Sequence, residues 1–216
     1  MSLQNLIQKW QSVMAVSGRI NGWTIMERST WQTLESVQTL TCPVVRASDV
    51  EEFQQAYEWM KLSMAEAGLS APASKLTPWW CWVQREPDHP HPYLEDADGY
   101  DDPVVLQLSI PAANVVLSCF DLWHWALNRW YVPANLEDEA DYEIAMKATG
   151  VDPEIVVQLE KRLQSSWLTI FDLDQDKIDA RPFSSKSIQG CFWRLEKSYV
   201  EAVLEREDLE SYEASE

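Results

Sequence analysis

Residues 120–131 hold a dense group of aromatic side chains, and they constrain the fold more than any other segment. The stretch reads FDLWHWALNRWY and contains three tryptophans, one tyrosine and one of the chain's three histidines. Tryptophan is large, costly to expose to water and carries an N–H group that needs an acceptor when it is buried. Such a segment forms either the centre of a hydrophobic core or the wall of a binding pocket.

The length and composition predict one folded domain with a sizeable core. The chain has 216 residues, 46% of them hydrophobic and twelve of them tryptophan. We expect an N-terminal helical extension over 1–18, a single α+β domain over 19–210 and an acidic tail over 211–216. Only six glycines are present, and neither a G-x-G-x-x-G nor a P-loop signature occurs. The pattern predicts an α+β fold in which short mixed or antiparallel strands pack with helices.

The net charge of −18 restricts the partners that the chain can bind. A surface this acidic repels phosphate, so we expect no direct binding to nucleic acid and no binding to anionic membranes. The same surface would attract a basic protein partner. Two other interpretations are that the charge keeps a tryptophan-rich chain soluble, or that the carboxylates imitate the phosphates of a nucleic acid. The first residues lack the uninterrupted apolar region of a signal peptide, no apolar run reaches 18 residues, and the four cysteines are scattered. We therefore expect a cytoplasmic protein with reduced thiols.

Apolar spacing and turn residues predict a mixture of helices and strands along the chain. We expect helices over 3–17, 30–38, 121–132 and 153–165, and a further helix that runs from the capping signal at 48–52 to about Gly68. Thr30 would cap the second of these helices; Asp121 would cap the helix over 121–132, and Pro133 would end it. We expect strands over 20–26, 79–83, 104–110, 115–118, 188–195 and 200–207. Strands 104–110 and 115–118 are expected to pair through the turn at 111–114, and residues 134–143 to form an acidic connector.

A helix that starts at Asp121 would place four polar side chains on one face. Asp121, His124, Asn128 and Tyr131 follow the spacing i, i+3, i+7, i+10, with Trp123 in the neighbouring apolar stripe. Polar groups flanked by aromatic rings are typical of a small-molecule pocket, in which Asp121 would orient His124. The alternative is that Asp121 only caps the helix and that the other three are ordinary polar neighbours.

Two further segments carry candidate binding residues. Trp79, Trp80 and Trp82 lie on one expected strand, where they either fill the core or form a stacking wall for a base or nicotinamide ring. The loop over 85–103 contains two histidines and several aspartates. The spacing of these residues matches no established metal site, so we predict none.

Several motifs together resemble a bacterial family of unknown function. The chain carries Trp-Thr-Ile at 23–25, Tyr-Glu-Trp-Met at 57–60, Pro-Trp-Trp-Cys-Trp at 78–82, and a long block, VLSCFDLWHWALNRWYVP, at 116–133. Ile-Gln at 188–189 and Phe-Trp-Arg-Leu at 192–195 complete the pattern, which spans about 22–207. Cys119 and Met26 stand where the family pattern has Asp and Gln. The resemblance implies no established activity.

The opening and closing segments are also similar to those of ADP-ribosyltransferase-type domains. That resemblance implies a split sheet that binds NAD in a cleft, with a catalytic Glu in the closing segment. Cys191 stands at that position, two residues after Gln189. A neutral thiol cannot supply the charge of a carboxylate, so the resemblance supports the fold rather than the activity.

These observations give two functional hypotheses. The first is a tryptophan-lined cleft that binds a small ligand, such as a nucleotide or an NAD-like molecule. The second is an acidic protein that binds or inhibits a basic or nucleic-acid-binding partner. The sequence identifies no cofactor and no catalytic residue. The expected ligand-contacting residues are Thr24, Trp82, Asp121, Trp123, His124, Asn128, Tyr131 and Gln189.

Overall fold

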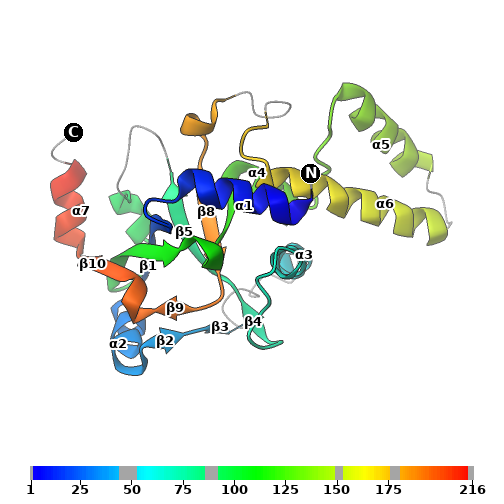
Figure 1. Ribbon diagram of the computed structural model, residues 1–216. Coiled ribbons are helices and arrows are strands. Elements are labelled where there is room, and N and C mark those ends of the chain that lie inside the picture. The colour runs from blue at the N-terminus through cyan, green and yellow to red at the C-terminus, as the bar shows by residue number, and fades with distance from the viewer. Residues whose placement is uncertain (1, 44–52, 86–91, 149–152, 176–180, 214–216) are drawn as a thin grey trace.

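A six-stranded sheet forms the centre of the molecule (Figure 1). The computed structural model describes residues 2–43, 53–85, 92–148, 153–175 and 181–213. Every neighbouring pair of strands in the sheet is antiparallel, which confirms the predicted α+β class. The strand order is β10 (Val200–Leu204), β6 (Pro103–Pro111), β1 (Arg19–Glu27), β5 (Trp79–Gln84), β8 (Ile188–Phe192) and β7 (Val116–Cys119).

Helices and two small ribbons surround this sheet. The α-helices are α1 (Leu3–Met14), α2 (Arg28–Val37), α3 (Gln54–Glu66), α4 (Phe120–Leu127), α5 (Leu136–Ala148), α6 (Pro153–Ser166) and α7 (Arg206–Glu213). The ribbons pair β2 (Thr39–Leu40) with β9 (Leu195–Glu196) and β3 (Cys42–Pro43) with β4 (Leu76–Thr77). Short 3-10 turns are η3 (Leu94–Ala97), η4 (Ala112–Asn114), η5 (Trp167–Phe171), η6 (Phe183–Ser185) and η7 (Lys197–Tyr199).

The main core lies between the sheet and helices α1, α3 and α4. Strand β6 runs through the sheet as an almost continuous apolar segment, and Val104 and Leu106 on it are fully buried. Helix α1 begins after Ser2, whose side chain accepts a hydrogen bond from the amide of Asn5. Its 3.6-residue periodicity places Ile7 and Trp10 in this core.

The sheet consists of two three-stranded halves that meet at β1 and β5. Strand β1 pairs with β6 along nine residues, whereas β1 and β5 are in register only at Trp23 and Trp82. The crossing is close, because a Cβ atom on Gly22 would lie 2.3 Å from the carbonyl oxygen of Trp82. Only glycine allows the two backbones to approach this closely.

A second, smaller core covers the half formed by β10, β6 and β1. Trp23, Val105 and Leu204 from these strands pack with Ala97 of η3 and Leu209 of α7. The junction between β1 and β5 therefore lies between the two cores.

Several predicted elements need correction. Strands β6 and β7 do not pair with each other, because β6 lies between β1 and β10 while β7 pairs with β8 at the other edge. Residues 134–143 are not a connector, since most of them belong to α5. Helix α2 begins at Arg28 after Glu27 rather than after Thr30. The capping signal at 48–52 lies outside the described residues.

Two further observations concern metals and membranes. Within the described residues, no group of three or more His, Cys, Asp or Glu side chains is placed to hold a metal ion, although 86–91 of the histidine-containing loop are not described. Among the described helices, none combines the length and apolar character required to span a bilayer.

Candidate functional site

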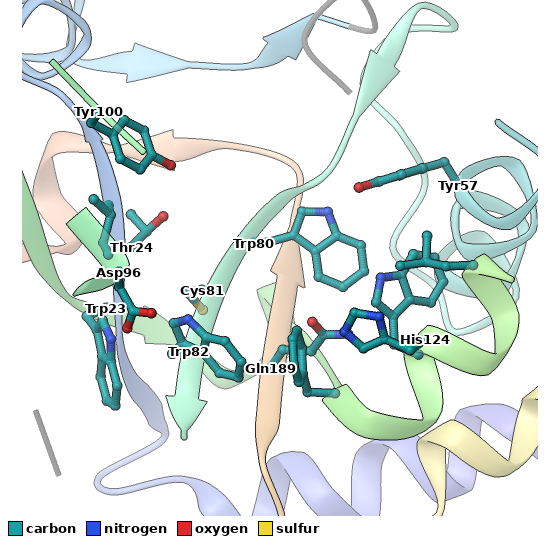
Figure 2. A pocket seen from close by; sticks show the side chains of 14 residues that line it. Trp23, Thr24, Tyr57, Trp80, Cys81, Trp82, Asp96, Tyr100, His124 and Gln189 are labelled. Atoms are coloured by element: carbon teal, nitrogen blue, oxygen red, sulfur yellow. The ribbon is translucent and has the colours of Figure 1, made fainter. Parts of the chain in front are cut away.

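A cavity of about 370 Å³ lies over the junction between β1 and β5 (Figure 2). We call it the aromatic cavity, because seven of its fourteen lining residues are Trp, Tyr or Phe. One wall comes from α3 and α4, the opposite wall from η3 and the turn after it, and the floor from the strands. The lining residues are Trp23, Thr24, Ile25, Tyr57, Trp80, Cys81, Trp82, Asp96, Tyr100, Phe120, Trp123, His124, Leu127 and Gln189.

Two tryptophans of β5 form the centre of this lining. Trp80 and Trp82 are two residues apart on one strand, so their side chains lie on the same face of the sheet. The ring of Trp80 lies 5.1 Å from that of Trp123, and the ring of Trp82 lies 4.4 Å from that of Phe120. Tyr57 from α3 meets both Trp80 and Trp123 edge to face. These contacts fix the orientation of the aromatic surfaces before any ligand arrives.

Polar groups reach the cavity from its floor and from α4. The side-chain amide of Gln189 on β8 donates to the hydroxyl of Ser118 at 3.2 Å, which holds the glutamine in place. Thr24 lines the cavity from β1, and the exposed imidazole of His124 packs edge to face on Phe120. Uncharged and titratable hydrogen-bonding groups therefore converge on one apolar space, as in many small-molecule sites.

Two indole nitrogens of the lining are unusual. The Nε1 atoms of Trp23 and Trp80 are buried, and neither has a hydrogen-bond partner among the described residues. A buried donor without an acceptor costs about 1–3 kcal/mol. Both atoms are covered by protein, so they are not donors to the cavity in this arrangement of the rings.

The wall opposite α4 carries a charged pair. Asp96 forms an ion pair with Arg85, whose guanidinium lies 5.2 Å from the Trp82 ring centroid and 4.6 Å from that of Tyr93. The amide of Tyr93 also donates to the Asp96 carboxylate at 3.3 Å. The carboxylate that lines the cavity is thus balanced by a cation held against aromatic rings.

The predicted polar stripe on α4 does not form, because the helix is shorter than expected. It begins at Phe120 after Cys119, so Asp121 is not its cap, and it ends at Leu127 rather than at Pro133. Arg129 adopts a left-handed backbone with φ of 56° and donates its amide to the Ala126 carbonyl. The Trp130 amide bonds to the Trp125 carbonyl at 2.8 Å, and this pair of bonds is a Schellman motif.

Three predicted residues consequently lie outside the cavity lining. Asp121 forms an ion pair with Arg181. Asn128 is exposed, and its side-chain amide donates to the His124 carbonyl at 2.7 Å. Tyr131 follows the reversed chain toward α5, where its ring stacks on Tyr142. The other five predicted residues, which are Thr24, Trp82, Trp123, His124 and Gln189, line the cavity together.

The cysteines near the site are not arranged as nucleophiles. Cys191 is fully buried, and its sulfur lies 3.8 Å from that of Met60 and 3.7 Å from that of Met64. Burial raises the pKa of Cys191 well above its ordinary value and raises that of Cys81 to about 12. At neutral pH both thiols are protonated.

Sequence reasoning missed the residues that reach the cavity from distant segments. Tyr57, Asp96 and Tyr100 lie on α3, on η3 and in the turn after η3, and no local pattern connects these segments with β5. The alternation of Trp80 and Trp82 was the one local signal available, since it places both rings on the same side of a strand.

A family model described as a domain of unknown function, DUF3841, matches residues 23–201. The chain belongs to this family. The match covers every strand of the central sheet except the beginning of β1 and the end of β10, and it includes every residue that lines the aromatic cavity. No curated protein and no solved structure matches this DUF3841 chain. The similarity to ADP-ribosyltransferase-type domains therefore stays a prediction.

Proposed function

We propose that the aromatic cavity binds a small ligand that contains a flat aromatic ring, such as a nucleotide or an NAD-like molecule. The observation that carries this proposal is the placement of Trp80, Trp82 and Trp123 around one cavity with Gln189 and His124. Stacking on an aromatic side chain is worth about 1–3 kcal/mol per base, and every base can stack because each has a π-face. A cavity of this kind suits an acidic chain that repels polynucleotides but can accept a single nucleotide.

The geometry also supports a ligand with hydrogen-bond acceptors. The amide of Gln189, the hydroxyl of Thr24 and the imidazole of His124 offer polar contacts to such a ligand. The carbonyl and ring nitrogen atoms of a nucleobase or nicotinamide supply matching acceptors. The resemblance to NAD-binding domains, which rests on the opening and closing segments of the sequence, implies the same class of ligand.

Calorimetric titration of the full chain with NAD, ATP, nicotinamide mononucleotide and adenosine tests the proposal. We expect at least one of these compounds to bind, and we expect His124→Ala to weaken it about fivefold by removing one hydrogen bond. Asn128→Ala is the matched control, because Asn128 lies one helical turn away but does not line the cavity. Equal effects of the two substitutions, or no binding by any compound at millimolar concentration, would contradict the proposal.

A second comparison uses tryptophans. Trp82→Ala removes a ring from the cavity, whereas Trp130→Ala removes an exposed ring just beyond α4. Loss of stacking is worth about 1–3 kcal/mol per base, so Trp82→Ala should weaken binding about tenfold or more. Trp130→Ala should leave the affinity unchanged.

A further inference from the structure

The hairpin formed by α5 and α6 has an unusual surface. It extends away from the central sheet (Figure 1). Helix α5 has no buried residue over its 13 positions, although a helix of this length is marginal in water by itself. The hairpin carries six of the thirteen exposed large apolar side chains found among the described residues, and these are Leu136, Ile144, Met146, Ile155, Val156 and Val157. Two of these six, Met146 and Val156, line a groove between the helices. Contiguous exposed apolar groups of this kind mark interaction surfaces.

A groove of about 330 Å³ lies between the two helices. Its floor is apolar, and it is large enough to accept bulky aliphatic side chains from a partner. The residues that line it are Arg129, Tyr142, Met146, Val156, Leu159, Glu160 and Leu163.

The α5 rim of this groove is acidic. Glu139 precedes Tyr142 by three positions and Met146 by seven, so helical spacing places it on the same face of α5 as these two groove residues. On the α6 side, Glu160 lines the groove, but Arg129, which also lines the groove, lies 2.6 Å away and balances its charge. Helix α5 as a whole carries five carboxylates and one lysine.

Charge decides which partner fits this surface. A second copy of the chain would bring another −18 charges, so self-association through the groove is disfavoured. Nucleic acids and anionic membranes are repelled for the same reason. A helix with an apolar stripe and lysines or arginines along one side matches both the apolar floor and the acidic α5 rim. We propose that the α5–α6 groove docks a basic amphipathic helix of a partner protein.

The test uses two model peptides of equal length and identical leucine stripe, one with lysines and one with glutamates on the polar face. Calorimetry with the full chain should show that the lysine peptide binds, that added salt weakens it, and that the glutamate peptide does not bind. Failure of the lysine peptide to bind, or equal binding of both peptides, overturns the proposal. Sedimentation of the free chain as a dimer that depends on Met146 would assign the groove to self-association and also overturn it.

Paired variants separate the groove from general charge attraction. The double substitution Met146→Ser and Val156→Ser removes apolar groove residues without changing the net charge, and both side chains are more than half exposed, so folding should be retained. We expect at least a tenfold loss of affinity for the lysine peptide. The control, Leu136→Ser with Ile144→Ser, changes exposed residues of α5 that do not line the groove. Equal affinities of the two double variants would show unspecific attraction and overturn the proposal.

Discussion

The aromatic cavity and the α5–α6 hairpin are built in opposite ways. The cavity brings together segments that are far apart in the sequence, from Trp23 on β1 to Gln189 on β8. Most of its contacts are between apolar rings. The hairpin is formed by the consecutive segments 136–148 and 153–166, and only α6 contributes buried side chains, those of Leu159 and Leu163.

A polar network replaces apolar burial at the base of the hairpin. The hydroxyl of Tyr131 donates to the Asp138 carboxylate, with distances of 2.9 and 2.8 Å to its two oxygens. Arg162 of α6 donates to the same carboxylate at 2.6 Å. The rings of Tyr131 and Tyr142 stack at 3.9 Å, and the Arg162 guanidinium lies near both.

This difference implies two levels of stability in one chain. Burial of apolar area stabilises the sheet, because the free energy gained scales with the area removed from water. Solvent-accessible ion pairs and hydrogen bonds to charged groups stabilise the hairpin, and each contributes less free energy than a buried apolar side chain does. We therefore expect the hairpin to open locally at a lower free energy than global unfolding requires.

The largest expected effect comes from truncating the centre of the sheet. Leu106→Ala removes a fully buried side chain of β6, which lies between Thr24 of β1 and Val203 of β10. The cavity left behind should lower the free energy of unfolding by about 3 kcal/mol. Leu136→Ala makes the same chemical change at an 84% exposed position of α5 and should alter it by less than about 0.5 kcal/mol. Denaturant titration measures the change in the free energy of unfolding for both variants, and equal changes would contradict the prediction.

A smaller effect is expected at the junction of the two half-sheets. Gly22→Ala would place a methyl group 2.3 Å from the Trp82 carbonyl oxygen, so β1 and β5 must separate. We expect a loss of about 2 kcal/mol from overpacking. Gly99→Ala is the control, because a Cβ atom there meets no atom within 4 Å. Thermal denaturation measures the stability of both variants. A Gly22→Ala variant as stable as wild type would contradict the prediction and show that β1 and β5 can separate at the junction without loss of stability.

Much of the architecture was predictable from local patterns. Alternating or continuous apolar runs placed β1, β5 and β6 correctly, and helical spacing placed α1, α3 and α6. Strand pairing was not predictable in the same way. The short connection 111–114 predicted a hairpin. Both edges of β6 are instead hydrogen-bonded to β1 and β10, which lie far away in the sequence.

The site was predictable only where its residues follow the geometry of one element. Trp80 and Trp82 obey strand alternation, whereas the stripe through Asn128 and Tyr131 required α4 to continue. The helix stops because Arg129 adopts a left-handed conformation, a position that glycine usually signals. The edge-to-face contact between Trp125 and Trp130, at 5.9 Å, accompanies this reversal. No glycine marks the turn in the sequence, so the end of the helix was assigned to Pro133.

The smallest predicted effect concerns Asp138 at the base of the hairpin, and it depends on pH. The pKa of Asp138 lies below its ordinary value, chiefly because the Ala134 amide donates to the carboxylate and also because Arg162 and Tyr131 do. The resulting stabilisation is complete above the ordinary pKa of about 4 and is lost as the pH falls through the lower pKa of the folded state. Asp138→Asn removes the charge, so it should increase hydrogen exchange of the α5 amides at pH 7 by an amount equivalent to about 1 kcal/mol.

The pH dependence and a matched substitution test the cause of this effect. The difference between wild type and Asp138→Asn should shrink as the pH is lowered below about 4, because the wild-type carboxyl group also becomes neutral. Glu143→Gln makes an equivalent change in the exposed pair with Lys147, at 3.0 Å on the same helix, and should alter exchange by less than about 0.5 kcal/mol. A difference between wild type and Asp138→Asn that stays constant with pH would mean that the shape of the Asp138 site, rather than its charge, holds the hairpin closed. The hairpin would then resemble the sheet in how it is stabilised, and the contrast between the two regions would disappear.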